Sequence, residues 1–210
     1  MNIPYEIHLT IADLTIEKTP FFVNLCQKQT GKAILIELAQ GENLQQPMFT
    51  KVIFEENLKN VLQKSNQYAN IFVENDFAIK RLKIEIPAQY SYLDTEHKLE
   101  ESSINSVDFK HYFEWHAKLS TLINNEKMKD LLNICQENMV HLSKNTLKNE
   151  QNTRFITLRE FGDKTVFEQR ITQLLENLQK NNFSIQKQQA EYCIYDDNTM
   201  LDNGWLTKKT

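Results

Sequence analysis

The sequence predicts an α+β protein made of two copies of one structural unit. One observation is that similar segments recur between 106 and 109 positions apart: "VNLCQK" at 23–28 matches "LNICQE" at 132–137, and "YEIH" at 5–8 matches "FEWH" at 113–116. The other is that each half alternates strand-like and helix-like patterns in the same order. Offsets this stable across most of both halves predict an internal duplication.

The first element of each half is predicted to be a strand. In residues 5–11, apolar and mostly polar side chains alternate, which is the period of a half-buried strand. A helix follows in the first half, with Thr19 as its N-cap, Pro20 in its first turn and Gly31 as its stop. The last helix of the second half is predicted to begin at a capping box that joins Thr165 and Glu168.

Each half therefore has the predicted order βαββαβ, which is the ferredoxin-like split βαβ unit. In this unit an antiparallel sheet carries two helices on one face, and its first and last strands lie side by side. We expect the other face to be open and polar. The predicted boundaries are a first repeat at 1–87, a linker at 88–110, a second repeat at 111–195 and a C-terminal tail at 196–210.

Composition excludes several classes of protein. The 210 residues carry a net charge of −4 with both signs interspersed, so we expect neither nucleic acid nor an anionic membrane as a partner. No leader-like or membrane-spanning stretch is evident, and three widely spaced cysteines argue against a disulfide framework. We expect a cytoplasmic protein in which Cys26 and Cys135, at equivalent helix positions, are buried apolar groups. The sequence does not determine the oligomeric state.

Strand alternation predicts which side chains share the open face. Both repeats place a Glu-x-His on the first strand, and basic residues and a second glutamate on the last strand. The third strand of the second repeat adds Thr157 and Arg159. In the first repeat the set is Glu6, His8, Thr10, Arg81, Lys83 and Glu85, and in the second it is Glu114, His116, Lys118, Lys187, Gln189 and Glu191.

This face suggests a small-ligand site in a polar cleft between the repeats. Histidines beside carboxylates suit general acid–base catalysis, so the catalytic candidates are Glu6, His8, Glu114 and His116. Basic and hydroxyl side chains suit a phosphate- or carboxylate-bearing ligand, so the binding candidates are Thr10, Arg81, Lys83, Lys118 and Arg159. Whether the protein is an enzyme stays open.

Two alternatives also stay open. One is a divalent metal site with one histidine and one glutamate from each repeat, namely His8, Glu85, His116 and Glu191. The other is a non-catalytic interaction protein, in which the polar residues pair with one another. The "HLTI" at His8 resembles the H-x-T motif of two-histidine phosphoesterases. The equivalent position of the second repeat reads "HAKL", whereas "HLSK" at His141 lies in a different strand, so the sequence identifies no family.

Overall fold

The computed structural model describes residues 2–93, 111–120, 125–147 and 153–204. Residues 94–110 of the predicted linker and 205–210 of the predicted tail lie outside this part. The first half contains β1 (Ile3–Ile11), α1 (Thr19–Lys28), β2 (Lys32–Leu38), β3 (Gln45–Glu55), α2 (Leu58–Glu74), β4 (Ile79–Pro87) and the 3-10 helix η1 (Ala88–Leu93). The second half contains β5 (Tyr112–Ser120), α4 (Asn125–Glu137), β6 (His141–Asn145), β7 (Thr153–Glu160), α5 (Lys164–Lys180), β8 (Ile185–Asp196) and η2 (Thr199–Asp202).

Both halves thus show the predicted element order, but the predicted sheet architecture is wrong. The sequence predicts two separate ferredoxin-like sheets, each with an open polar face. Instead, the strands form one closed antiparallel barrel in the order β1-β3-β2-β6-β7-β5-β8-β4. Two pairings that the predicted units lack produce this closure, β2 with β6 and β4 with β8.

The polar face is accordingly not open. The candidates Thr10, Arg81, Lys83, Glu85 and Glu191 are all buried, as are Glu114 and Arg159 of the second repeat. Alternation along a strand specifies which side chains share a face, whereas it does not specify what covers that face.

The chain divides into two compact units. Unit 1 comprises residues 1–35, 46–111 and 191–201, and unit 2 comprises residues 36–45, 112–190 and 202–210. The end of β8 therefore belongs to unit 1, together with β1, β3 and β4. The predicted domain boundaries stay a prediction.

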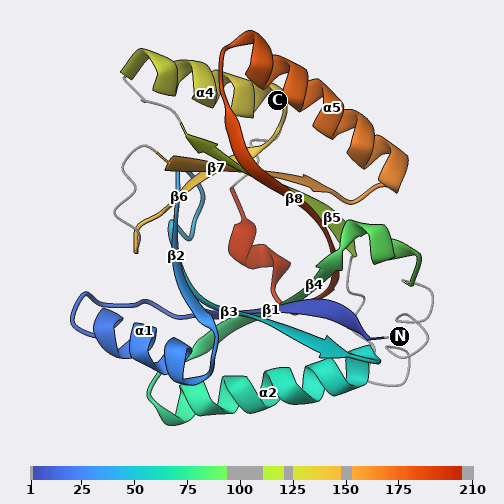
Figure 1. Cartoon of the computed structure of the whole chain (residues 1–210). Helices are drawn as coiled ribbons and strands as arrows, with labels where there is room; N and C mark the ends of the chain where they lie inside the picture. The colour runs from blue at the N-terminus through green and yellow to red at the C-terminus, as the bar shows by residue number, and fades with distance from the viewer. Residues whose placement is uncertain (1, 94–110, 121–124, 148–152, 205–210) are drawn as a thin grey trace. The chain divides into compact units, whose positions relative to one another are not determined.

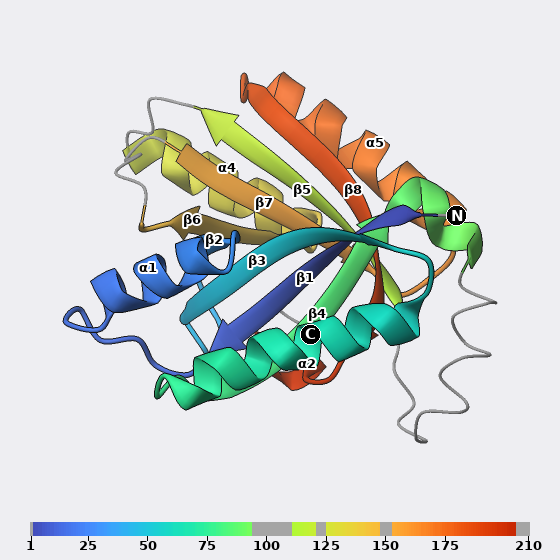
Figure 2. The same cartoon turned by 60° about the horizontal axis from the view of Figure 1, so that its bottom comes forward.

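In unit 1, α1 and α2 lie on the same side of β1, β3 and β4 (Figures 1 and 2). Aromatic rings form the contact between these layers. Phe49 of β3 lies 5.1 Å from Phe72 of α2, and Phe22 of α1 lies 5.9 Å from the same ring, as distances between ring centroids. Gly31 leaves room for this packing, because a Cβ atom there would lie 2.1 Å from the Phe49 ring.

In unit 2, α4 and α5 lie on one side of β5 and β7 (Figure 1). Phe113 of β5 stacks on Phe167 of α5, with the ring centroids 4.9 Å apart. The predicted capping box of α5 is wrong by two residues, since the N-cap is Asp163. Its side chain accepts hydrogen bonds from the backbone N–H groups of Thr165 and Val166, at 2.7 and 3.0 Å.

The cap predicted for α1 also differs. Thr19 is the first helical residue, and the N-cap is Lys18, which makes no side-chain capping bond. Cys26 and Cys135 are buried in α1 and α4, as predicted, and burial raises the pKa of each thiol to about 12. No helix in the described ranges is both long and apolar enough to span a bilayer.

Candidate functional site

The register of unit 1 places the predicted polar residues directly opposite one another. β1 and β4 pair antiparallel with Glu6 opposite Glu85, His8 opposite Lys83 and Thr10 opposite Arg81. On the other side of β1, Thr50 of β3 lies opposite His8. Directly opposite residues on one face have neighbouring Cβ atoms, so the side chains can interact.

His8 is held at both ring nitrogens. Nδ1 lies 2.9 Å from Thr50 Oγ1, and Nε2 lies 2.8 Å from Glu85 Oε2. On its other oxygen, Glu85 contacts the Lys83 Nζ at 3.0 Å. Carboxylate contacts of this kind fix the orientation of an imidazole ring.

Glu85 is the most buried carboxylate of this group, with 1% of its surface exposed. Its contacts with His8 and Lys83 are close enough for ion pairs but lack hydrogen-bond geometry. Within the described residues, His8 Nε2 and both carboxylate oxygens of Glu85 are therefore buried without a hydrogen bond. Such a carboxylate retains the capacity to accept hydrogen bonds from a bound group.

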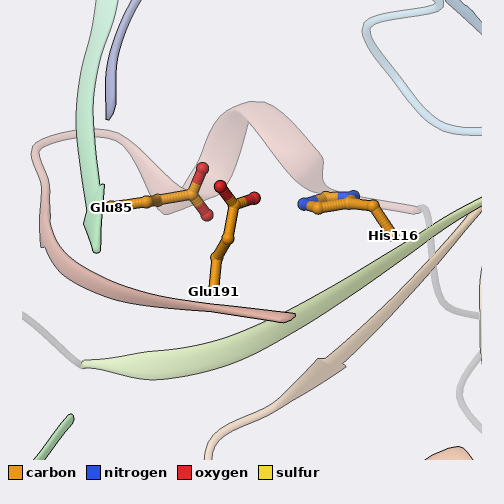
Figure 3. A group of neighbouring side chains, drawn as sticks. All are labelled: Glu85, His116 and Glu191. Carbon is orange, nitrogen blue, oxygen red and sulfur yellow. The ribbon is translucent and has the colours of Figure 1, made fainter. Parts of the chain in front are cut away.

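Glu191 brings a third carboxylate to this face from β8. Figure 3 shows the carboxylates of Glu85 and Glu191 facing each other, and oxygen atoms of the two lie within 4.8 Å. The third side chain in Figure 3, His116, belongs to unit 2.

The pKa of Glu6 is raised above its ordinary value. Burial raises its pKa most, and the nearby charges of Glu191 and Glu85 and a hydrogen bond with Glu191 raise it further, although His8 lowers it. A carboxyl group that is desolvated beside other carboxylates holds its proton more tightly. We name Glu6, His8, Glu85 and Glu191 the acidic cluster of unit 1.

A buried ion pair also lies on this face. Arg81 Nε donates to Asp196 Oδ1 at 2.8 Å, and the Arg81 NH2 group donates to the other carboxylate oxygen. This fork-to-fork contact neutralises Arg81. Thr10, opposite Arg81 on β1, is buried as well.

Unit 2 repeats the histidine–threonine contact, but the carboxylate beside the histidine comes from its own strand. His116 Nδ1 lies 3.0 Å from Thr157 Oγ1, and its Nε2 lies 3.3 Å from Glu114 Oε2. Arg159 Nε donates to Glu114 Oε1 at 2.7 Å, and its NH2 group donates to Asp202 at 2.7 Å. The second Glu-x-His is thus combined with an arginine.

His141 is a further buried histidine of unit 2. It lies opposite Thr157, on the side of β7 away from His116. Burial lowers its pKa to about 4, despite the opposing charges of Asp202 and Glu114. His141 is therefore neutral near pH 7.

The structure brings together most of the predicted site residues within each unit, and their catalytic and binding roles stay predictions. Three predicted anion contacts, Arg81, Lys83 and Arg159, contact carboxylates of the chain itself. The fourth basic candidate, Lys118, is half-buried opposite Phe155.

Sequence reasoning missed three residues of these sites: Thr50, Asp196 and Asp202. Thr50 was detectable, because the repeat alignment of "MFTKVIF" with "FITLREF" places it at the position of Thr157. Asp196 and Asp202 fall in the predicted tail, where no pattern indicates that they reach an arginine.

Comparison with known proteins gives little further information. No family profile and no curated protein match the sequence. Among solved structures, the chain is similar to three mutant forms of chlorite dismutase from Candidatus Nitrospira defluvii, each at 13% identity and a TM-score of 0.30. The matches cover 96%, 91% and 96% of this chain and 94%, 91% and 93% of those chains. Similarity at this level supports no argument about cofactor, substrate or activity.

Proposed function

We propose that the protein binds a small, positively charged ligand at the acidic cluster of unit 1. The observation that carries the proposal is the collection of three carboxylates, Glu6, Glu85 and Glu191, on one largely buried face. Collecting buried negative charge is unfavourable, as the raised pKa of Glu6 indicates. A bound cation relieves this repulsion, so the cluster favours cationic ligands.

This proposal reverses the sign of the ligand that the sequence predicts. An anion at Arg81, Lys83 or Arg159 would have to displace a carboxylate that contacts the same cation. Breaking one partner away from a buried ion pair is strongly unfavourable. We therefore keep the small ligand and the His/Glu chemistry of the sequence-based hypothesis, and replace the anion by a cation.

His8 and Glu85 are the proton-transfer pair of this proposal. Thr50 fixes Nδ1 of the imidazole, and Glu85 lies against Nε2. A ligand ammonium or hydroxyl group beside Glu85 would give a proton to this carboxylate, and the His8 ring, which faces Glu85 through Nε2, would hold the carboxylate in place.

Calorimetric titration of the purified chain tests the binding step. The probes are methylammonium, methylguanidinium and Mn²⁺, each with chloride as counter-ion. We expect Glu6→Gln to weaken binding of the organic cations at least ten-fold. Glu37→Gln is the matched control, because Glu37 forms an exposed pair with Lys144. Absence of binding by every probe, or equal binding by wild type and Glu6→Gln, contradicts the proposal.

A divalent metal ion is the second candidate occupant. His8 Nε2 and Glu85 Oε2 are donor atoms 2.8 Å apart, and Glu191 supplies oxygen ligands next to Glu85. Imidazole and carboxylate donors suit Zn²⁺ and Mn²⁺. The fourth predicted ligand, His116, belongs to unit 2, and its participation stays a prediction.

Binding of a metal ion and binding of an organic cation should depend on different side chains. A metal ion requires His8 Nε2, so His8→Ala should abolish Mn²⁺ binding, whereas an organic cation requires Glu6 more than His8. Metal binding also releases protons, and its affinity should fall steeply below about pH 6. Titration of both variants with both probes separates the candidates.

A further inference from the structure

In each repeat, one residue of a neighbouring strand lies opposite the glutamate of the Glu-x-His. The two repeats have different residues at this position. In unit 2, Arg159 of β7 lies opposite Glu114 of β5. In unit 1, Val52 of β3 lies opposite Glu6 of β1. The repeat alignment of "MFTKVIF" with "FITLREF" gives Val52 and Arg159 the same place in their units. Glu114 therefore faces a guanidinium, and Glu6 faces an isopropyl group.

Unit 2 shows how this fold holds a guanidinium at that place. The Arg159 side chain contacts Glu114 Oε1 through both Nε and NH2, at 2.7 and 2.6 Å. Its other face lies over the Tyr112 ring, 4.2 Å from the centroid, and this ring contacts Phe161 at 5.2 Å. A carboxylate on one side and an aromatic ring on the other is a favourable environment for a planar cation.

Unit 1 has a carboxylate, Glu6, and one of the two aromatic rings at the equivalent positions. Val52 stands where unit 2 has Arg159. By the same alignment Phe54 is the counterpart of Phe161, and Pro4 stands where unit 2 has Tyr112. Phe54 lies opposite Pro4 and is 63% exposed, while the neighbouring Val52 is 48% exposed. Two large apolar side chains thus reach solvent beside Glu6, a carboxyl group whose raised pKa reflects burial and negative neighbours.

Exposure along this face indicates the side from which a ligand arrives. Val52 and Phe54 are exposed, Glu6 and His8 are half-buried, and Thr10 is fully buried next to the Arg81–Asp196 pair. The accessible end therefore combines apolar surface with a carboxyl group. A ligand entering there meets Phe54 and Val52 first and Glu6 next.

We propose that the cation bound by unit 1 is a guanidinium group, which takes the place beside Glu6 that the Arg159 side chain takes beside Glu114. This inference rests on the proposed function, since it names the chemical class of the same ligand. The guanidinium donates two hydrogen bonds to Glu6, and its apolar substituent lies against Val52 and the Phe54 ring. The class comprises small guanidino compounds and exposed arginine side chains of a peptide.

Replacing Val52 by arginine is the sharpest test, because it supplies the cation from the chain itself. We expect Val52→Arg to weaken methylguanidinium binding at least ten-fold and to lower the pKa of Glu6, followed by carbon NMR of its carboxyl group. Val52→Met is the uncharged control at the same position, and Val73→Arg adds the same charge at an exposed site of α2. Val73→Arg should bind methylguanidinium as the wild type does, and Val52→Met, which keeps an uncharged apolar side chain, should bind it much more tightly than Val52→Arg does.

A second measurement compares the affinities of different cations. The wild type should bind methylguanidinium at least five-fold more tightly than methylammonium, and benzylguanidinium more tightly still, because its ring can lie against Phe54. Phe54→Ser should remove the advantage of the benzyl group, and it should weaken methylguanidinium binding much less than Glu6→Gln does.

The outcomes separate this inference from the proposed function. If methylammonium and methylguanidinium bind equally, and both need Glu6, cation binding stands and the guanidinium assignment is overturned. If Val52→Arg binds methylguanidinium as tightly as Val52→Met, the assignment is likewise overturned. If no cation binds the wild type, both proposals fail.

Discussion

Arg81 on β4 pairs through two donor groups with Asp196, 115 residues further along the chain. Both side chains are almost fully buried, and the pair lies within unit 1. The pair ties the last residue of β8 to β4, next to the opposed backbone positions of Lys83 and Asp196. The Asp196 carboxylate also neutralises the Arg81 guanidinium, which the sequence predicts to bind a ligand.

Breaking this pair should destabilise the protein strongly. We expect Asp196→Ala to lower the free energy of unfolding by about 3–5 kcal/mol, because it leaves the Arg81 charge buried without its carboxylate. The double variant Arg81→Met/Asp196→Leu should recover a large part of this loss. Urea denaturation measures both values. Lys144→Met, which breaks the exposed pair with Glu37, is the control and should change stability by less than about 1 kcal/mol.

Glu6 should make stability depend on pH in the acidic to neutral range. Its pKa in the folded state is raised above the ordinary value of 4.5, so folding favours the protonated form. Its contribution is fully present below pH 4.5 and is lost as the pH rises through the raised pKa. The stability of the wild type relative to Glu6→Gln should therefore fall as the pH rises from about 4.5 through the raised pKa of Glu6. A constant difference would show that Glu6 is not perturbed.

His141 should act in the opposite direction. Its folded pKa of about 4 lies below the ordinary 6.5, so its contribution is present above pH 6.5 and is lost as the pH falls toward 4. A shift of this size corresponds to a loss of roughly 3 kcal/mol by about pH 4. His141→Gln, which cannot take up a proton, should lose less stability than the wild type over this range in urea denaturation. Parallel losses in the two proteins would refute the prediction.

The cysteines should be unreactive while the protein is folded. Cys26, Cys135 and Cys193 are buried, and burial raises the pKa of the first two thiols to about 12. The thiolate is the reactive form, so alkylation by iodoacetamide at about pH 7.5 should be at least a hundred-fold slower than in about 8 M urea. Mass spectrometry of quenched samples measures the rates. Rapid modification of Cys26 or Cys135 in the folded protein would contradict their buried, apolar role.

Much of the candidate site was predictable from local pattern. Because alternate side chains of a strand point to one face, "YEIHLTI" specifies that Glu6, His8 and Thr10 lie together, and "KRLKIE" does the same for Arg81, Lys83 and Glu85. The pairing of β1 with β4 then places these sets opposite each other. The internal match also predicts that His116 has the same kind of surroundings as His8, and each histidine does contact a threonine of the neighbouring strand.

The role of each charge was not predictable in this way. Arg81, Lys83 and Arg159 look like anion contacts in the sequence, because the carboxylates that pair with them come from distant or unpatterned segments. Asp196 reaches Arg81 only because β4 pairs with β8, and a register shift occurs in that pairing between Ile84 and Glu85. Asp202 reaches Arg159 from η2, which the sequence assigns to a tail.

The sequence by itself determined the element order, the faces of the strands and the duplicated Glu-x-His, since these depend on periodicity within about ten residues. Tertiary structure alone decided that the strands close into a barrel, that the polar face is buried, and which carboxylates neutralise which cations. Closure depends on the pairing of β2 with β6 and of β4 with β8. Strands pair through backbone hydrogen bonds, which do not depend on the identity of the side chains. Pairing between distant strands therefore leaves no local signal in the sequence.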